Sequence, residues 1–225
     1  MVTKRKKLLK EPDEFFTTTG RLINWVKVHP RQVTYAVLAF LAMTVAVTGF
    51  RYYTERRAQT ASSLLSQILT SYQEALSQGD PKQAYQTVEP DFKRLISEYG
   101  SQPAGRLGLV YYAHFSAAAQ APDTAITLYQ EALTRFRGDA PLANVIGHSL
   151  AMAYEQKGDS AAAIEQYRQI ARGASLLHKA DALFQLTRLY QQTGEAEKSR
   201  EVLEQLNKEF PDSIYAEPAA ELAAG

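Results

Sequence analysis

The chain has 225 residues, of which 45% are hydrophobic and 22% charged, a composition typical of folded proteins and not of disordered ones. The absence of cysteine excludes disulfide scaffolds, cysteine-ligated zinc and thiol catalysis. The net charge of +1 conceals an asymmetry: residues 1–31 carry eight basic and three acidic side chains, whereas residues 51–225 carry 17 basic and 21 acidic ones. A basic head followed by a mildly acidic body argues against nucleic-acid binding along the main surface.

The head, residues 1–31, contains a stretch that has the composition of an amphipathic helix between Glu11 and Val28. Pro12 suits a first helical position, and Trp25 lies beside a set of apolar residues that recur at helical spacing: Phe15, Phe16, Leu22, Ile23 and Val26. Such a helix is expected to lie on an anionic leaflet. The alternative is a disordered tail.

Residues 32–50 predict a transmembrane helix, because no charge occurs in these 19 residues. At ~1.5 Å per residue the helix is about 28 Å long, close to the thickness of the hydrocarbon core. A cleaved signal peptide would need a shorter apolar segment and a small-residue cleavage site, which are absent. A buried core helix is the other alternative, although such helices rarely extend so far without a polar face.

The orientation of this span follows from the flanking basic residues. Three lie within twenty residues on each side, and the cluster between Lys4 and Lys10 decides in favour of a cytoplasmic N-terminus. The rest of the chain would then lie in the periplasm if the host is a Gram-negative bacterium. We therefore predict a single-pass protein of the bacterial inner membrane.

Small residues recur on one face of the span, where they would let another helix approach closely. They are Ala39, Ala42, Ala46 and Gly49. Since alanine is common in any span, the absence of a specific helical partner is an equally open alternative.

After the span, a stalk at 51–59 is expected to continue as one helix into a soluble domain. Apolar residues from Ala61 to Leu76 keep a period of 3.6, and no proline occurs between Arg31 and Asp80. Gly79, Asp80 and Pro81 then combine a helix-ending glycine, an N-cap and a first-position proline.

Residues 60–212 contain an internal repeat. Gly158-Asp159 and Gly194-Glu195 lie 36 residues apart, and Tyr154 and Tyr190 precede these glycines by four residues each. Segment ends repeat as well, because Tyr99, Phe136 and Phe210 fit a step of 37 residues that is interrupted at Gly173.

These features resemble the tetratricopeptide repeat, in which each unit is a pair of antiparallel helices with glycine at the mid-turn. The most specific segment is Tyr154-Glu155-Gln156-Lys157-Gly158-Asp159 followed by Ala163-Ile164. The segment Gln120-Ala121-Pro122 departs from the repeat pattern, because it lacks the glycine expected at the mid-turn. The resemblance implies an all-α fold, with one N-terminal transmembrane helix, a tetratricopeptide-like α-solenoid and a C-terminal tail at 213–225.

We find no motif for catalysis, and we predict neither an enzyme nor a cofactor. Gly147-His148-Ser149-Leu150-Ala151 resembles a nucleophile elbow but lies within a helical pattern. Gly100 and Gly105 have the spacing of a phosphate loop, but the lysine is missing. No metal site is predicted, and a solvated or groove-lining role is expected for the four histidines: His29, His114, His148 and His178.

A stacked helical array has a concave surface lined by the first helix of each pair, suited to an extended peptide or a partner helix. The repeat phase places these residues on it: Val110, His114, His148, Met152, Glu155, Phe184, Arg188 and Gln191. Packing against a neighbouring helix is the alternative for about half of them.

The junction Gly49-Phe50-Arg51-Tyr52-Tyr53 and the helix after it resemble a bacterial membrane-anchored tetratricopeptide family that includes the ancillary subunit of the Sec translocon. This resemblance implies a domain at the periplasmic exit of the translocon, associated with periplasmic chaperones and binding emerging proteins. The alternative is a scaffold that docks a folded partner in envelope assembly, cell division or secretion.

Overall fold

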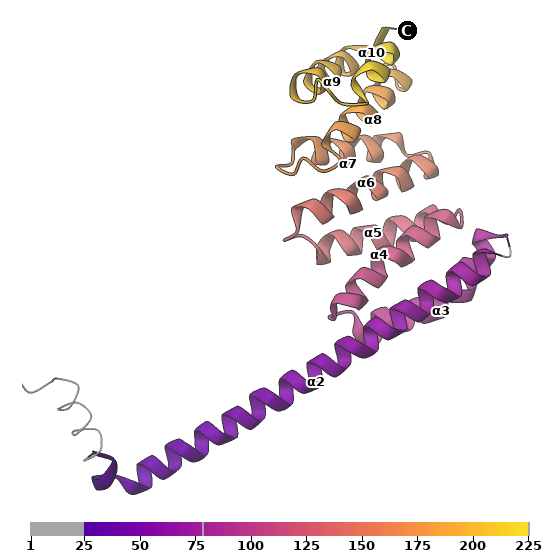
Figure 1. Ribbon diagram of the computed structural model, residues 1–225. Helices are drawn as coiled ribbons and strands as arrows, with labels where there is room; N and C mark the ends of the chain where they lie inside the picture. The colour runs from indigo at the N-terminus through magenta and orange to yellow at the C-terminus, as the bar shows by residue number, and fades with distance from the viewer. Residues whose placement is uncertain (1–24, 78, 225) are drawn as a thin grey trace, which may run out of the picture. The chain divides into compact units, whose positions relative to one another are not determined.

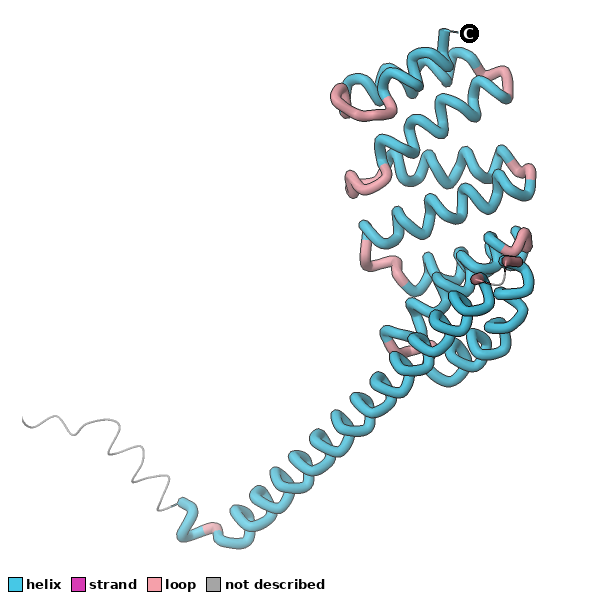
Figure 2. The backbone as a smooth tube through the Cα atoms, turned by 45° about the vertical axis from the view of Figure 1, so that its right-hand side comes forward, coloured by secondary structure: helices cyan, strands magenta, loops and turns pink. Residues whose placement is uncertain are grey.

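The computed structural model describes residues 25–77 and 79–224 (Figure 1). These residues form α-helices joined by short turns, and no strand occurs among them (Figure 2). The all-α class predicted from the sequence is therefore confirmed. The chain divides into two compact units, Met1–Arg56 and Arg57–Gly225, which are described separately.

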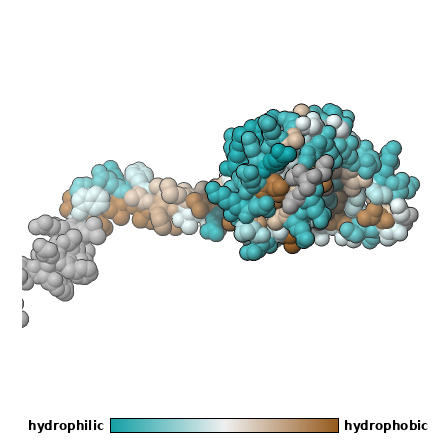
Figure 3. Space-filling view, turned by 90° about the horizontal axis from the view of Figure 1, so that it is seen from above, coloured by the Kyte–Doolittle hydropathy of each residue, from teal (hydrophilic) through white to brown (hydrophobic). Residues whose placement is uncertain are grey.

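In the first unit, a short helical segment at 25–28 precedes helix α2, Pro30–Leu76, which extends into the second unit. The amphipathic helix expected at 11–28 lies almost wholly outside the described residues. Within the described chain, α2 is the helix that is long and apolar enough to cross a membrane, and its most apolar window is entirely exposed. The first part of α2 shows runs of brown and pale surface, whereas the second unit is largely teal (Figure 3).

The threonines of this apolar segment satisfy their own hydroxyl groups. Thr34, Thr44 and Thr48 each donate a hydrogen bond to the carbonyl oxygen four residues earlier, at 2.9, 2.9 and 2.8 Å. A hydroxyl bonded within its own helix presents no open donor to a surrounding apolar medium. These polar side chains are therefore compatible with a lipid environment.

The second unit begins with residues 57–76 of α2, and its helices stack in chain order (Figures 1 and 2). Successive helices form antiparallel pairs, and a last short helix follows. The helices after α2 are α3 Pro81–Tyr99, α4 Pro103–Ala118, α5 Pro122–Arg135, α6 Ala140–Lys157, α7 Ser160–Arg172, α8 Lys179–Gln192, α9 Ala196–Glu209 and α10 Ala216–Ala224. The α-solenoid expected from the repeats is confirmed, and α10 lies within the segment expected as a C-terminal tail.

Local sequence explains where these helices begin. Asp80, Asp139 and Asp159 each precede a helix and accept a hydrogen bond from a backbone N–H of its first turn. Such caps satisfy donors that have no partner inside the helix. The expected N-cap at Asp80 is thereby confirmed, and Arg137-Gly138-Asp139 is a turn between repeats.

Three of the mid-turns share one backbone geometry. Gly158 and Gly194 adopt φ of +85° and +80°, and the following residue donates to the carbonyl five positions earlier, as in Asp159 N to Tyr154 O at 2.9 Å. The glycine-free turn has the same pattern, since Ala121 N donates to Ser116 O at 2.9 Å and Gln120 has φ of +59°. Gln120 therefore occupies a left-handed position that favours glycine.

The core consists of three clusters of buried side chains, each shared by consecutive helices. The first joins residues 57–76 with α3 and α4, and it includes Tyr72 stacked on Phe115 with ring centroids 3.6 Å apart. The second joins α4, α5 and α6, and the third continues from α6 to α10. Because each cluster needs helices from neighbouring pairs, a single pair cannot bury its apolar face alone.

Candidate partner-binding groove

The residues predicted to line a groove all lie on the first helices of successive pairs. Val110 and His114 belong to α4; His148, Met152 and Glu155 belong to α6; Phe184, Arg188 and Gln191 belong to α8. The repeat phase therefore placed all eight residues on α4, α6 and α8. Their surroundings divide them into an open group and a group engaged in contacts within the chain.

The open group surrounds a cavity of about 390 Å³ between α4 and α6. It contains His114 and Met152 from the predicted set, and Met152 is 55% exposed. The other lining residues are Ala117, Ala118, Tyr129, Ser149, Ala153 and Gln156. Most of these side chains are small or apolar, as in sites that accept an apolar side chain with a few polar contacts.

One hydrogen bond links the two helices that form the walls of this cavity, and a buried tyrosine lies beside it. Gln156 Nε2 donates to Ala117 O at 3.1 Å, which bridges α6 and α4 directly. Tyr129 of α5 is 2% exposed, and burial raises the pKa of its hydroxyl to about 12. The phenol therefore stays neutral at physiological pH, so the site presents no charge from this ring.

On α4 and α8, three predicted residues are partly covered. Val110 packs against the second core cluster. Phe184 stacks on Tyr215 with ring centroids 5.5 Å apart, and Gln191 Nε2 donates to Leu222 O of α10 at 2.9 Å. The C-terminal segment therefore covers part of the α8 face that the repeat phase predicted to be open.

Glu155 and Arg188 join α6 to α8. Arg188 Nη2 forms an ion pair with Glu155 Oε2, and the two side chains are 27% and 22% exposed. Tyr167 Oη donates to the other carboxylate oxygen of Glu155 at 2.9 Å, so both oxygens have partners. A carboxylate that is paired and hydrogen-bonded in this way organises the helix contact more than it attracts a ligand.

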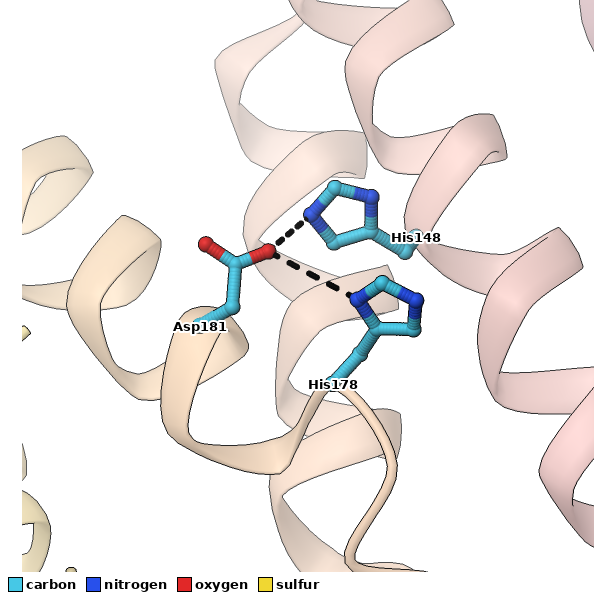
Figure 4. A group of neighbouring side chains, drawn as sticks. All are labelled: His148, His178 and Asp181. Atoms are coloured by element: carbon cyan, nitrogen blue, oxygen red, sulfur yellow. Dashed lines mark ion pairs between the residues drawn. The ribbon is translucent and has the colours of Figure 1, made fainter. Parts of the chain in front are cut away.

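A second polar cluster, made of His148, His178 and Asp181, connects the same two helices (Figure 4). His148 projects from α6, His178 is the residue before α8, and Asp181 lies in the first turn of α8. His148 Nε2 contacts Asp181 Oδ2, and His178 Nδ1 lies 3.9 Å from the same oxygen. Their potential ligand atoms all lie within 4.8 Å of one another.

No metal site is predicted from the sequence, yet the structure brings two of the four histidines next to one carboxylate. The sequence contains one local indication of this cluster: Asp181 follows His178 by three residues, and residues at this spacing lie on the same side of a helix. His148 is 30 residues away from His178 along the chain, so its arrival depends on the stacking of α6 against α8. Sequence spacing contains no information on that contact.

Burial and neighbouring charge shift the pKa values in this cluster. Burial lowers the pKa of His178, and the nearby His148 lowers it further. For Asp181, burial acts to raise the pKa, but the hydrogen bond and charge of His148 outweigh it and the net pKa lies below its usual range. The cluster therefore combines an ionised carboxylate with a neutral His178 near neutral pH.

Another hollow, of about 660 Å³, lies beside the start of α3 and the turn after α4. Asp80, Lys82, Tyr85 and Gln86 line one side, and residues 118–121 line the other. The repeat phase did not predict this hollow, because the phase assigns residues to the faces of helices and part of the hollow is lined by turn residues.

Comparison with known protein families identifies the family to which this chain belongs. The tetratricopeptide repeat-like domain family matches residues 24–176, and a tetratricopeptide repeat family matches residues 181–213. The chain belongs to the tetratricopeptide repeat-like domain family. A comparison with curated proteins gives no match.

Two solved structures resemble this tetratricopeptide protein. One, a tetratricopeptide repeat protein from Parabacteroides merdae, is 14% identical with a TM-score of 0.56, and the alignment covers 72% of this chain and 59% of that one. The other, from Podosopora anserina and described as a kinesin light chain with nearly identical repeats, is 16% identical with a TM-score of 0.54, covering 74% and 85%. At these identities the similarity shows the fold alone.

The tetratricopeptide fold also accounts for the motifs that resembled catalytic sites. Gly147 to Ala151 lie inside α6, where the strand required by a nucleophile elbow does not occur. Gly105 lies in α4, where a Cβ atom would be 1.9 Å from Tyr99 O, so its glycine serves close packing. This fold is typically an interaction scaffold and not a catalyst.

The small residues predicted as a packing face all lie on α2 and are exposed. They are Ala39, Ala42, Ala46 and Gly49. A Cβ atom built at Gly49 meets no atom within 4 Å. The face is thus accessible within its unit, and its use for helix packing stays a prediction.

Proposed function

We propose that this tetratricopeptide protein is anchored in the bacterial inner membrane and acts on the periplasmic side, where it binds emerging proteins next to the Sec translocon and periplasmic chaperones. Tetratricopeptide repeats indicate the broader functional class, a scaffold for protein–protein interaction. The observation that carries the binding part of this proposal is the apolar cavity between α4 and α6, with His114 and Met152 at its walls.

Membrane anchoring is supported by the surface of α2. Large apolar side chains are widely exposed along it, for example Tyr35, Phe40 and Val45 at about 70% each. Transfer of such a surface out of water is favourable by roughly 25 cal/mol per Å². The internally bonded threonine hydroxyls remove the main polar penalty of that transfer. The N-terminus-in orientation depends on the basic cluster at Lys4–Lys10.

Binding of extended chains is supported by the character of the cavity. Met152 is flexible and polarisable, so it adapts to different apolar side chains. Ser149 and Gln156 provide polar groups at the rim without a net charge. A mostly apolar cavity selects for exposed hydrophobic residues, which emerging chains display and folded proteins bury.

The topology can be tested by cysteine labelling, because the natural chain has no cysteine. Glu201→Cys places a thiol on exposed α9, and Lys27→Cys places one on the exposed segment before the span. In spheroplasts of a Gram-negative host, an impermeant maleimide should label the first variant before lysis and the second only after lysis. The opposite order would overturn the proposed orientation.

The partner can be tested by replacing Met152 with a photoreactive residue in cells, followed by mass spectrometry. Glu201 on α9 provides a matched control position, exposed but outside the cavity. We expect Met152 adducts with translocon subunits, chaperones and many apolar segments of exported proteins. Equal adducts from both positions would contradict a role for the cavity, and one dominant folded partner at Met152 would support the alternative scaffold.

A further inference from the structure

The cluster of His148, His178 and Asp181 has the composition of a transition-metal site. Two imidazole nitrogens and one carboxylate oxygen form a donor set that suits Zn²⁺, whereas Mg²⁺ and Ca²⁺ prefer oxygen ligands alone. The two rings and the carboxylate converge on one point between α6 and the start of α8 (Figure 4). We propose that this cluster binds a zinc ion.

The distances are compatible with such an ion after small movements. Around a tetrahedral zinc, with bonds of ~2.0–2.1 Å, neighbouring ligand atoms lie about 3.3 Å apart. His178 Nδ1 and Asp181 Oδ2 are 3.9 Å apart, and all three ligand atoms lie within 4.8 Å of one another. Three protein ligands leave a fourth position for water.

Backbone geometry gives an independent reason for a ligand at His178. This residue has φ of +58°, in the left-handed region that few non-glycine residues adopt. It occupies the N-cap position of α8, yet its side chain makes no capping hydrogen bond. Instead its ring stacks on that of His148, with centroids 4.8 Å apart. Unusual backbone conformations that persist without a capping benefit concentrate at ligand sites.

The loop that presents His178 is fixed from the helix that carries His148. Asn144 of α6 donates through Nδ2 to Leu177 O at 2.8 Å and to Ser175 O at 3.3 Å. On the other side, Gln185 Nε2 donates to Asp181 Oδ1 at 3.3 Å, which orients the carboxylate. Contacts of this kind hold ligands in place before a metal arrives and tune its affinity.

An ion pair between His148 and Asp181 is the competing explanation. It accounts for those two residues, whose side chains are 15% and 13% exposed. His178 lies farther from the carboxylate, with its Nδ1 3.9 Å from Asp181 Oδ2, and its ring stacks on that of His148. A shared metal ion accounts for all three positions. Its effect would be to tie the third helix pair to the fourth, independently of any partner in the cavity between α4 and α6.

The test uses the full chain in detergent, purified with a histidine-free tag and stripped of metal with a chelator. Zn²⁺ binding is measured by equilibrium dialysis, and Co²⁺ absorption spectra report the coordination geometry. We expect one Zn²⁺ per chain and a tetrahedral Co²⁺ spectrum. Loss of a first ligand should weaken binding by roughly 100-fold or more, since even outer partners contribute 10–100-fold.

Three variants test whether His178 and Asp181 bind the zinc ion. His178→Asn removes the imidazole while asparagine tolerates the left-handed backbone, and Asp181→Asn removes the carboxylate charge. His114→Asn is the matched control, because His114 lies on α4 outside the cluster. Thermal unfolding without metal checks that each variant is folded. Unchanged zinc binding in either cluster variant, or an equal loss in His114→Asn, would overturn the proposal, as would failure of the natural chain to bind Zn²⁺.

Discussion

Replacement of Gln120 by glycine should stabilise the repeat unit. Gln120 lies two residues after the end of α4, in the turn to α5, and its φ of +59° matches the left-handed conformation of Gly158 and Gly194 in the later turns. Its side chain is exposed, so its removal costs little packing. The substitution therefore isolates the energy of the left-handed backbone at one position.

The magnitude follows from two opposing terms. A non-glycine residue in the left-handed conformation costs roughly 1–2 kcal/mol. Glycine in turn loses more backbone freedom on folding, which offsets about 0.5–1 kcal/mol. The net gain for Gln120→Gly should be about 0.5–1 kcal/mol. Gly158→Ala should lose a similar amount, because a Cβ atom there meets no atom within 4 Å and only the backbone term acts.

Urea unfolding of the full chain in detergent, followed by far-ultraviolet circular dichroism, measures both effects. The midpoint should rise for Gln120→Gly and fall for Gly158→Ala with an unchanged slope, and Tm should shift by roughly 1–4 °C in each direction. A stabilised Gly158→Ala variant, or a destabilised Gln120→Gly variant, would refute the shared turn geometry. The two substitutions should change the stability in opposite directions, which no general effect of mutation produces.

Three further substitutions test the groove residues. Met152→Glu should weaken capture of apolar peptides at least tenfold without changing Tm, measured by fluorescence anisotropy, because a charge enters a neutral cavity. Phe184→Ala should lower the unfolding free energy by about 1–2 kcal/mol, because the ring contact with Tyr215 is lost. This loss is smaller than for a fully buried ring, and an unchanged Tm would contradict this packing. Arg188→Glu should also destabilise the fold, since it places a second carboxylate against Glu155. Adding Glu155→Gln to this variant should recover part of the lost stability, because it removes one of the two facing charges.

The fold was predictable because its determinants are local. Tyr99, Phe136, Gly173 and Phe210, spaced 37 residues apart, each lie at the end of a helix: Tyr99 is the last residue of α3, and the others are the C-caps of α5, α7 and α9. The interruption at Gly173 changes the residue type and leaves the boundary in place. Spacing and helix capping depend on neighbours within a few residues, which a sequence displays directly.

The surface was less predictable because it depends on contacts between pairs. Phe184 has the phase of a groove residue, yet a segment some 30 residues later covers it through Tyr215. The turn at Gln120 lacked the expected glycine and still adopted the glycine conformation, because the flanking helices fix the turn. Likewise, no local pattern reports that His148 meets Asp181. Register between helix pairs is decided by packing, and periodicity within one helix cannot specify it.

The contacts between α6 and α8 also bear on how a partner would be held. Between these helices, the Glu155–Arg188 pair and the contact of His148 with Asp181 already use the polar groups of the predicted groove. Among the predicted groove residues, the open volume is the cavity of about 390 Å³ between α4 and α6, which is near the lower end for ligand sites. A site of this size accepts few side chains, so its intrinsic affinity for an extended chain is weak. A membrane anchor would compensate by raising the local concentration of chains that emerge nearby. Under the proposed function, we expect weak binding at high local concentration to permit both capture and release of a chain.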